Sequence, residues 1–229
     1  SIRLVGSEMC IRDRYLGNLK ILAFDIGSNY SSIALHDDGN INSFTVPASP
    51  RQRPDWDYLF SKLELIPNQI LNSLDGLAYA NGPGSYTALR STAVFLKAIA
   101  YAKNIPIFPI SNLEALAWQA KDWMDSFPVE INVALNADQA KFYSASYKLS
   151  SQYIETVSSP KICSTEELEK IASKEKILVG EGWLLLSDKE NLLKSVQANA
   201  SSVVSLTLHY INPVSYTHLR CRRPDWCRS

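Results

Sequence analysis

Residues 79–90 read YANGPGSYTALR and place a glycine-proline turn between two apolar segments. The segment before the turn, Leu74 to Ala80, is apolar enough for a buried strand. The segment after it, Ala88 to Ala102, contains neither Gly nor Pro and few polar residues, which favours a largely buried helix. Strand, tight turn and helix in this order are typical of an α/β fold.

The turn supports two interpretations. Gly82 and Gly84 allow backbone angles that are closed to other residues, and Ser85 or Thr87 can cap the helix. Unpaired amides and the helix dipole then form an anion cradle, with Gly82, Gly84 and Ser85 as candidate phosphate or nucleotide contacts. The alternative is an ordinary connection between strand and helix, because no Lys follows Gly84 in the Walker pattern.

The remaining pattern predicts a two-lobed α/β protein. Strands are expected at 19–24, 31–35 and 41–46, a Pro67-kinked helix at 56–74, a strand at 107–110, and a helix from a Ser111–Glu114 capping box to Met124. This order indicates a mixed sheet flanked by helices, as in ribonuclease-H-like and actin-like domains. The second half repeats it in reduced form, with strands near 130–135, 141–147, 153–157 and 176–179 and a capping box at Ser164–Glu167.

We therefore predict an N-terminal actin-like domain at 19–125 and a smaller C-terminal actin-like domain at 128–214. The ends, 1–14 and 215–229, resemble translated adapter sequence and are expected to be non-native tails. The formal net charge is zero. The first tail has three Arg against two acids and the second four Arg against one, which leaves about four negative charges on the body. An RNA-binding module remains an alternative through the Arg-rich tail.

Composition also bears on location. No apolar run approaches the roughly 20 residues of a membrane span, and Cys163 is the single cysteine of the body. A cytoplasmic protein without membrane contact is the expectation.

The chemistry of the polar residues leaves one enzymatic alternative. Asp25-Ile26-Gly27-Ser28 fits the first phosphate loop of an actin-like ATP-dependent kinase, with Asp25 in the metal shell. The competing explanation is that Asp25 caps backbone amides at the end of a strand. A kinase also needs a second phosphate loop, but the turn at Asn136 and Asp138 lacks its glycine, and Gly180-Glu181-Gly182 is a weak candidate for the adenosine side.

Other catalytic sites find little support. His36, His209 and His218 are the histidines, and no two of them have the spacing of a metal-binding pair. Ser85 lacks a nucleophile elbow and a histidine base identifiable from sequence. We expect neither a catalytic residue nor a metal site.

The helix after the turn is apolar on two faces. Leu89, Ala93, Leu96 and Ala100 form one face, while Phe95, Ala98 and Ala102 form the second. Such a helix needs two packing partners. One is its own sheet, and the other is a neighbouring helix or a second protein.

Several separated motifs resemble the TsaB (YeaZ) family, the bacterial partner subunit in making threonylcarbamoyladenosine on transfer RNA. Residues 81–90 are similar to the family's GPGSFTGLR. The resemblance continues through ILAFD at 21–25, LIP at 65–67, KAIAYA at 97–102, NIP at 104–106 and SNLEALA at 111–117, and it covers roughly residues 19 to 214.

The resemblance implies a non-catalytic subunit of the tRNA N6-threonylcarbamoyladenosine (t6A37) complex. It would pair with a TsaD-like catalytic subunit and a TsaE-like ATPase, form a homodimer when the partner is absent, and meet tRNA only indirectly. The chain alone would bind no cofactor, and ATP or ADP with a metal would belong to the complex. The interface residues implied on the helices at 56–74 and 88–102 are Leu63, Ile66, Ile70, Arg90, Phe95, Ala98 and Ala102.

Overall fold

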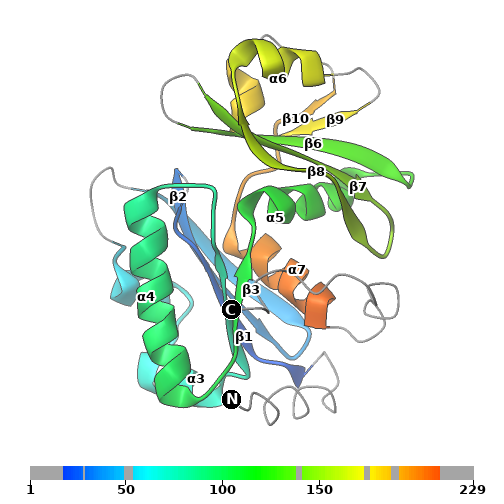
Figure 1. The fold of residues 1–229 in the computed structure, drawn as a ribbon. Helices are drawn as coiled ribbons and strands as arrows, with labels where there is room; N and C mark the ends of the chain where they lie inside the picture. The colour runs from blue at the N-terminus through cyan, green and yellow to red at the C-terminus, as the bar shows by residue number, and fades with distance from the viewer. Residues whose placement is uncertain are drawn as a thin grey trace, which may run out of the picture.

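The computed structural model describes residues 18–27, 29–48, 54–137, 141–172, 176–186 and 191–211. They form two α/β lobes, one above the other in Figure 1. The predicted tails, Ser28 and Asp138 lie outside the described residues. Within the described ranges, no helix is both long and apolar enough to cross a membrane.

The first lobe is a five-stranded mixed sheet with the strand order β3-β2-β1-β4-β5. Strands β4 and β5 run parallel to β1, whereas β2 and β3 form antiparallel pairs. Its elements are β1 (Ile21–Asp25), β2 (Tyr30–Asp37), β3 (Asn40–Pro47), α2 (Trp56–Lys62), α3 (Pro67–Ser73), β4 (Gly76–Ala80), α4 (Tyr86–Lys103) and β5 (Ile107–Ile110). Both faces of β1 are apolar: Leu22 and Phe24 belong to the core on the α4 side, and Ile21 and Ala23 to the core on the other side.

The second sheet has the order β10-β9-β6-β7-β8, which repeats the pairing pattern of the first. The chain continues through α5 (Asn112–Gln119), η2 (Ala120–Trp123), β6 (Val129–Asn136), β7 (Phe142–Leu149), β8 (Ile154–Cys163), α6 (Thr165–Ile171), β9 (Ile177–Val179), η3 (Glu181–Leu185), β10 (Leu192–Leu193) and α7 (Ala200–Ile211). The copy is reduced, because a five-residue 3₁₀ helix stands where the first lobe has α4 and the edge strand β10 has two residues. The predicted fold class, two actin-like lobes with a smaller second lobe, is confirmed.

Helices α5 and α7 lie back to back between the two sheets (Figure 1). Helix α5 follows the first sheet in the chain but packs on β6 and β7, whereas α7 follows the second sheet but packs on β1, β2 and β4. The Trp118 indole donates to Ser205 Oγ at 3.0 Å, and the Tyr210 hydroxyl donates to the Glu114 carboxylate. One apolar core therefore includes residues of both lobes. The division of the chain between 125 and 128 stays a prediction.

Two local predictions about helices were wrong. The segment 56–74 is not one kinked helix. Helix α2 ends before its C-cap residue Leu63, Glu64 has a positive φ of 55°, and α3 starts afresh with Pro67 in its first turn, where a missing amide is harmless.

The Ser111–Glu114 capping box does not form either. Ser111 makes no side-chain cap bond, and its hydroxyl is hydrogen-bonded to Tyr147 instead. The Glu114 carboxylate accepts from Tyr210 of α7. The α-helix then ends at Gln119, and a 3₁₀ turn covers the rest of the segment to Trp123. The second capping box is confirmed, with both the Ser164 and the Glu167 bonds present.

Candidate functional site

The two glycine motifs singled out in the sequence lie against each other. The Ser85 amide donates to the Gly27 carbonyl at 2.8 Å, and a Cβ added to Gly84 would lie 2.3 Å from that same oxygen. Gly84 has no positive φ, so no special backbone angle requires a glycine at this position. The close approach of the Gly27 carbonyl requires one, because it leaves no room for a Cβ atom. The space and the amide that could have received a phosphate are taken by the chain itself.

Gly82 differs from Gly84, because its φ of +116° is the left-handed conformation predicted for the turn. Asn112 at the start of α5 holds this residue from two sides. Its amide donates to the Gly82 carbonyl at 2.8 Å, and its side-chain oxygen accepts from the Gly82 amide at 3.3 Å. Sequence reasoning missed Asn112, since it was read only as part of a capping box. Ser85 is the N-cap residue of α4, but its side chain makes no cap bond.

Asp25 ends β1 and is 2% exposed. The Gly27 amide donates to its Oδ1 at 3.4 Å, as the capping interpretation expected. Burial raises the pKa of this carboxyl from 3.8 to about 6, and the Gly27 hydrogen bond offsets only part of the rise. The Asp25 carboxylate could therefore bind a proton or a cation. In the described ranges, however, no three His, Cys, Asp or Glu side chains are grouped so that they could bind a metal ion.

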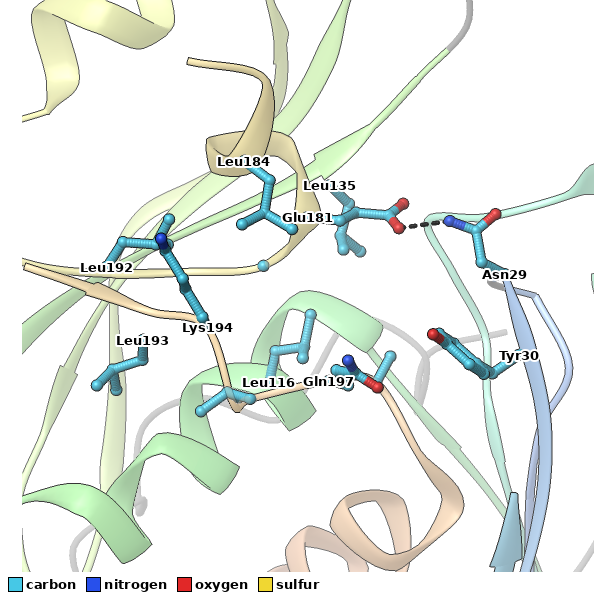
Figure 2. Close-up of a pocket in the computed structure, with 13 residues that line it drawn as sticks. Asn29, Tyr30, Leu116, Leu135, Glu181, Leu184, Leu192, Leu193, Lys194 and Gln197 are labelled. Carbon is cyan, nitrogen blue, oxygen red and sulfur yellow. Dashed lines mark hydrogen bonds between the residues drawn. The ribbon is translucent and has the colours of Figure 1, made fainter. Parts of the chain in front are cut away.

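A cleft of about 170 Å³ opens between the lobes (Figure 2). The start of β2 forms one wall, with Asn29 and Tyr30, and η3 and β10 form the other, while Leu116 of α5 lies at its base. The Asn29 amide donates to the Glu181 carboxylate at 2.6 Å, and this bond joins the two walls. The lining is largely aliphatic, and its side chains that can donate hydrogen bonds are Asn29, Tyr30, Lys194 and Gln197.

The glycines of Gly180-Glu181-Gly182 also have a packing role. A Cβ at Gly180 would lie 2.3 Å from the Ala134 carbonyl oxygen, and one at Gly182 would lie 3.0 Å from Ala134 atoms. Gly180 has a φ of +105° besides. The next residue, Trp183, is fully buried and donates to the Asn132 carbonyl at 3.1 Å. This segment is explained by its close contact with β6.

The outer side of α4 is the second candidate site, and it is apolar and exposed. Tyr101 is 91% exposed, Tyr86 72% and Val94 67%, and Ala98 and Ala102 on the adjoining side of the helix are exposed as well. We call these five residues the α4 surface. Large apolar side chains gathered on one exposed helix side are typical of a contact surface. Tyr86, Val94 and Tyr101 were missed because they lie on a third side of the helix, between the two faces that the sequence pattern distinguished.

The implied interface residues differ in how far their side chains are exposed. Ala98 and Ala102 are exposed on α4, and Ile66 is 56% exposed at the start of α3. Leu63 and Phe95 are half-buried, and Phe95 stacks on Trp56 with ring centroids 4.2 Å apart.

Ile70 and Arg90 behave differently. Ile70 belongs to the core of the first lobe, so its side chain is not on the surface. Arg90 donates to the Tyr86 hydroxyl at 3.0 Å and lies over the Tyr86 ring, which fixes one end of the α4 surface.

Comparison with known proteins identifies consistent relatives. The model of a family described as TsaD, tRNA N6-adenosine threonylcarbamoyltransferase, matches residues 66–218. The tRNA threonylcarbamoyladenosine biosynthesis protein TsaB of Buchnera aphidicola (subsp. Schizaphis graminum) is 29% identical, over 77% of this chain and 85% of its own. TsaB of Haemophilus influenzae is 28% identical, over 83% and 85%. The solved structure of YeaZ from Pseudomonas aeruginosa has a TM-score of 0.67 at 21% identity and covers 92% of this chain and 93% of its own.

Replacing Asp25 by Asn is expected to stabilise the protein, more at pH 8 than at pH 5. Because the folded-state pKa is raised to about 6, the protonated carboxyl favours the folded state, and this contribution is lost as the pH rises through about 6. The neutral asparagine would avoid a penalty of at most about 3 kcal/mol at pH 8. Urea unfolding of both proteins at the two pH values measures the difference. An equal effect at pH 5 and pH 8 would contradict the assignment.

Proposed function

Because this chain belongs to the TsaB (YeaZ) family, we propose that it is a non-catalytic subunit for the synthesis of N6-threonylcarbamoyladenosine in tRNA. It pairs with a TsaD-like catalytic subunit and works with a TsaE-like ATPase. The curated relatives named TsaB are biosynthesis proteins for this nucleoside, and they support this role. The observation that carries the proposal is the exposed apolar α4 surface.

The α4 surface has the composition of a protein interface. Aromatic residues are enriched in such interfaces and charged residues are depleted from their centres. Tyr86 and Tyr101 provide large side chains at the two ends of the helix, and the small residues Ala98 and Ala102 let a partner helix approach closely. By helical spacing Lys97 and Arg90 lie on the same exposed side, between Tyr86 and Tyr101, so the surface also carries two positive charges. Ile66, 56% exposed as the N-cap residue of α3, adds a further exposed apolar side chain on a helix that contacts α4.

The family match supports a partner with the same fold as this chain. A chain that matches the model of a transferase family over residues 66–218 shares its fold with that enzyme. Two chains of one fold can pair by placing equivalent helices against each other around an approximate twofold axis. The same geometry permits a homodimer through α4 when the catalytic partner is absent.

The loop contacts support a non-catalytic role. The Gly27 carbonyl occupies the space next to Gly84 and accepts from the Ser85 amide. A phosphate bound in the predicted cradle would have to displace this contact. In this proposal nucleotide and metal bind in the assembled complex, and tRNA meets this subunit through the catalytic partner.

Replacing Ala98 by Arg is expected to abolish binding of the TsaD-like partner and leave the fold intact. The new side chain would stand where a partner helix must approach, and it would bury a charge. The measurement is co-elution of the purified proteins in size-exclusion chromatography, with circular dichroism to check the fold. Ser151→Arg, on an exposed bend of the second lobe, adds the same group away from α4 and is the matched control. Complex formation by Ala98→Arg at unchanged affinity would refute the interface.

Replacing Tyr101 by Ala is expected to weaken the complex by about 2 kcal/mol, as for a tyrosine that is an interface hot spot. This corresponds to an increase in Kd of roughly thirtyfold. The free energy of unfolding of the isolated chain should change by less than about 0.5 kcal/mol, since the side chain is 91% exposed. Isothermal titration calorimetry with the partner and urea unfolding without it separate the two effects. A loss of stability that matched the loss of affinity would assign Tyr101 to the fold.

Calorimetry with Mg-ATP tests the kinase alternative. We expect no tight binding by the isolated chain, because the Gly27 carbonyl occupies the space beside Gly84 and accepts from the Ser85 amide. Micromolar affinity that disappears in Asp25→Ala would favour an actin-like kinase and overturn the non-catalytic assignment.

A further inference from the structure

A polar groove of about 350 Å³ lies on the outer face of the second sheet. Along β6 and β7 the residues alternate, and Ile131, Val133, Ala145 and Tyr147 face the core beneath α5 and α7. The opposite face holds a smaller apolar core with Ala134 and Phe142 beneath α6 and η3, and the part beside that core carries polar side chains. The residues that line the groove are Glu130, Ser144, Ser146, Val157, Ser158, Lys161, Lys170, Ile171 and Lys176.

The floor of the groove is built from two serines. Ser144 is 2% exposed, and its hydroxyl has no hydrogen-bond partner among the residues that the structure describes. Ser146 Oγ donates to Asn132 Oδ1, and Asn132 Nδ2 donates to the Ile171 carbonyl of α6 at 3.3 Å. The floor is thereby fixed to the end of α6, while one nearly buried hydroxyl is left facing the groove.

The walls of the groove carry a surplus of positive charge. The strand register places Lys161 of β8 opposite Ser144 of β7. Lys176 forms an ion pair with Glu130, which neutralises both groups. In the described part of the chain, no carboxylate lies within ion-pair distance of Lys161 or Lys170, although Lys170 attracts Glu166 one turn earlier on α6.

From this arrangement we propose that the groove binds a phosphate group. Two ammonium groups supply charge from above, and the Ser144 hydroxyl supplies a donor from the floor. Charge-assisted hydrogen bonds of this kind are the strong ones for phosphate oxygens. The Ser144 hydroxyl is nearly buried, so water can satisfy its hydrogen-bonding capacity only in part. A phosphate oxygen would accept the hydrogen bond that is missing. The body of the chain is negatively charged overall, so the attraction is local to this groove and does not cover the whole surface.

The groove is independent of the proposed partner surface. It lies in the other lobe from α4, on the side of the second sheet that faces away from α5 and α7. Loss of phosphate binding would therefore leave the partner interface untouched, and the converse also holds.

Titration calorimetry with inorganic pyrophosphate on the full chain tests the proposal. Wild type should bind, and Lys161→Gln with Lys170→Gln should weaken binding by about tenfold or more. Ser144→Ala keeps both charges and should weaken it roughly fivefold. Lys62→Gln with Lys103→Gln removes the same charge from the first lobe and should leave the affinity unchanged. Circular dichroism confirms that each variant is folded.

A second arm identifies the source of the phosphate. A short RNA hairpin that competes with pyrophosphate, and loses affinity in the same groove variants, assigns the site to a phosphodiester backbone. Pyrophosphate binding without RNA competition assigns it to a small phosphorylated molecule. The proposal is overturned if wild type does not bind pyrophosphate at millimolar concentration, or if the groove variants bind it as well as wild type.

Discussion

The packing of α5 against α7 is the interaction on which the whole structure depends. Each helix follows one sheet in the chain and packs on the other, so neither lobe buries its own inner face alone. The polar contacts follow the same plan, since Trp118 reaches Ser205 and Tyr210 reaches Glu114 across the helix pair. Burial raises the pKa of Glu114, because a buried carboxylate loses its contact with water. The hydrogen bond from Tyr210 replaces part of that contact and so stabilises the helix pair. The α7 start is held by the first lobe as well, because the Ala200 amide donates to Ser32 Oγ at 2.8 Å.

This shared core also determines where the glycine loop lies. Asn112, the first residue of α5, forms hydrogen bonds with Gly82 through its backbone amide and its side chain. Gly84 packs against Gly27, just after the end of β1. The start of α4 is thus fixed by both neighbouring strands and by the interlobe helix. A helix held so firmly at one end presents its exposed side in one orientation, which suits a contact surface.

Much of the fold could be predicted from residue patterns, because strand alternation and helix spacing are local properties. Every predicted strand is present, and the edges differ by a few residues. The errors arose where a distant side chain competed with a local one. Glu114 would complete a capping box in isolation, but Tyr210, 96 residues away, takes its carboxylate. For Gly84 the phosphate contact stays a prediction, but the close approach of Gly27, which also requires a glycine there, is a distant contact that the local pattern does not indicate. The α4 surface was predicted in part. Helical periodicity indicated Ala98 and Ala102, but the exposure of Tyr101 depends on whether another element of the fold covers that side of α4, which periodicity does not show.

The two sheets share one strand order but differ in what covers them. In the first, the connection after β4 is the 18-residue helix α4, and the strands beneath it carry Leu22, Phe24 and Leu77. In the second, the equivalent connection after β9 is a single 3₁₀ turn, and part of the outer face carries Asn132, Ser144 and Ser146. Strand composition and crossover length are therefore matched within each copy. A protein engineer who grafted an α4-like helix onto the second lobe would place it over β9 and β10 and would have to replace Asn132 on the neighbouring β6 by an apolar residue. Ser144 and Ser146 are on β7, the counterpart of β2, which α4 does not cover in the first lobe.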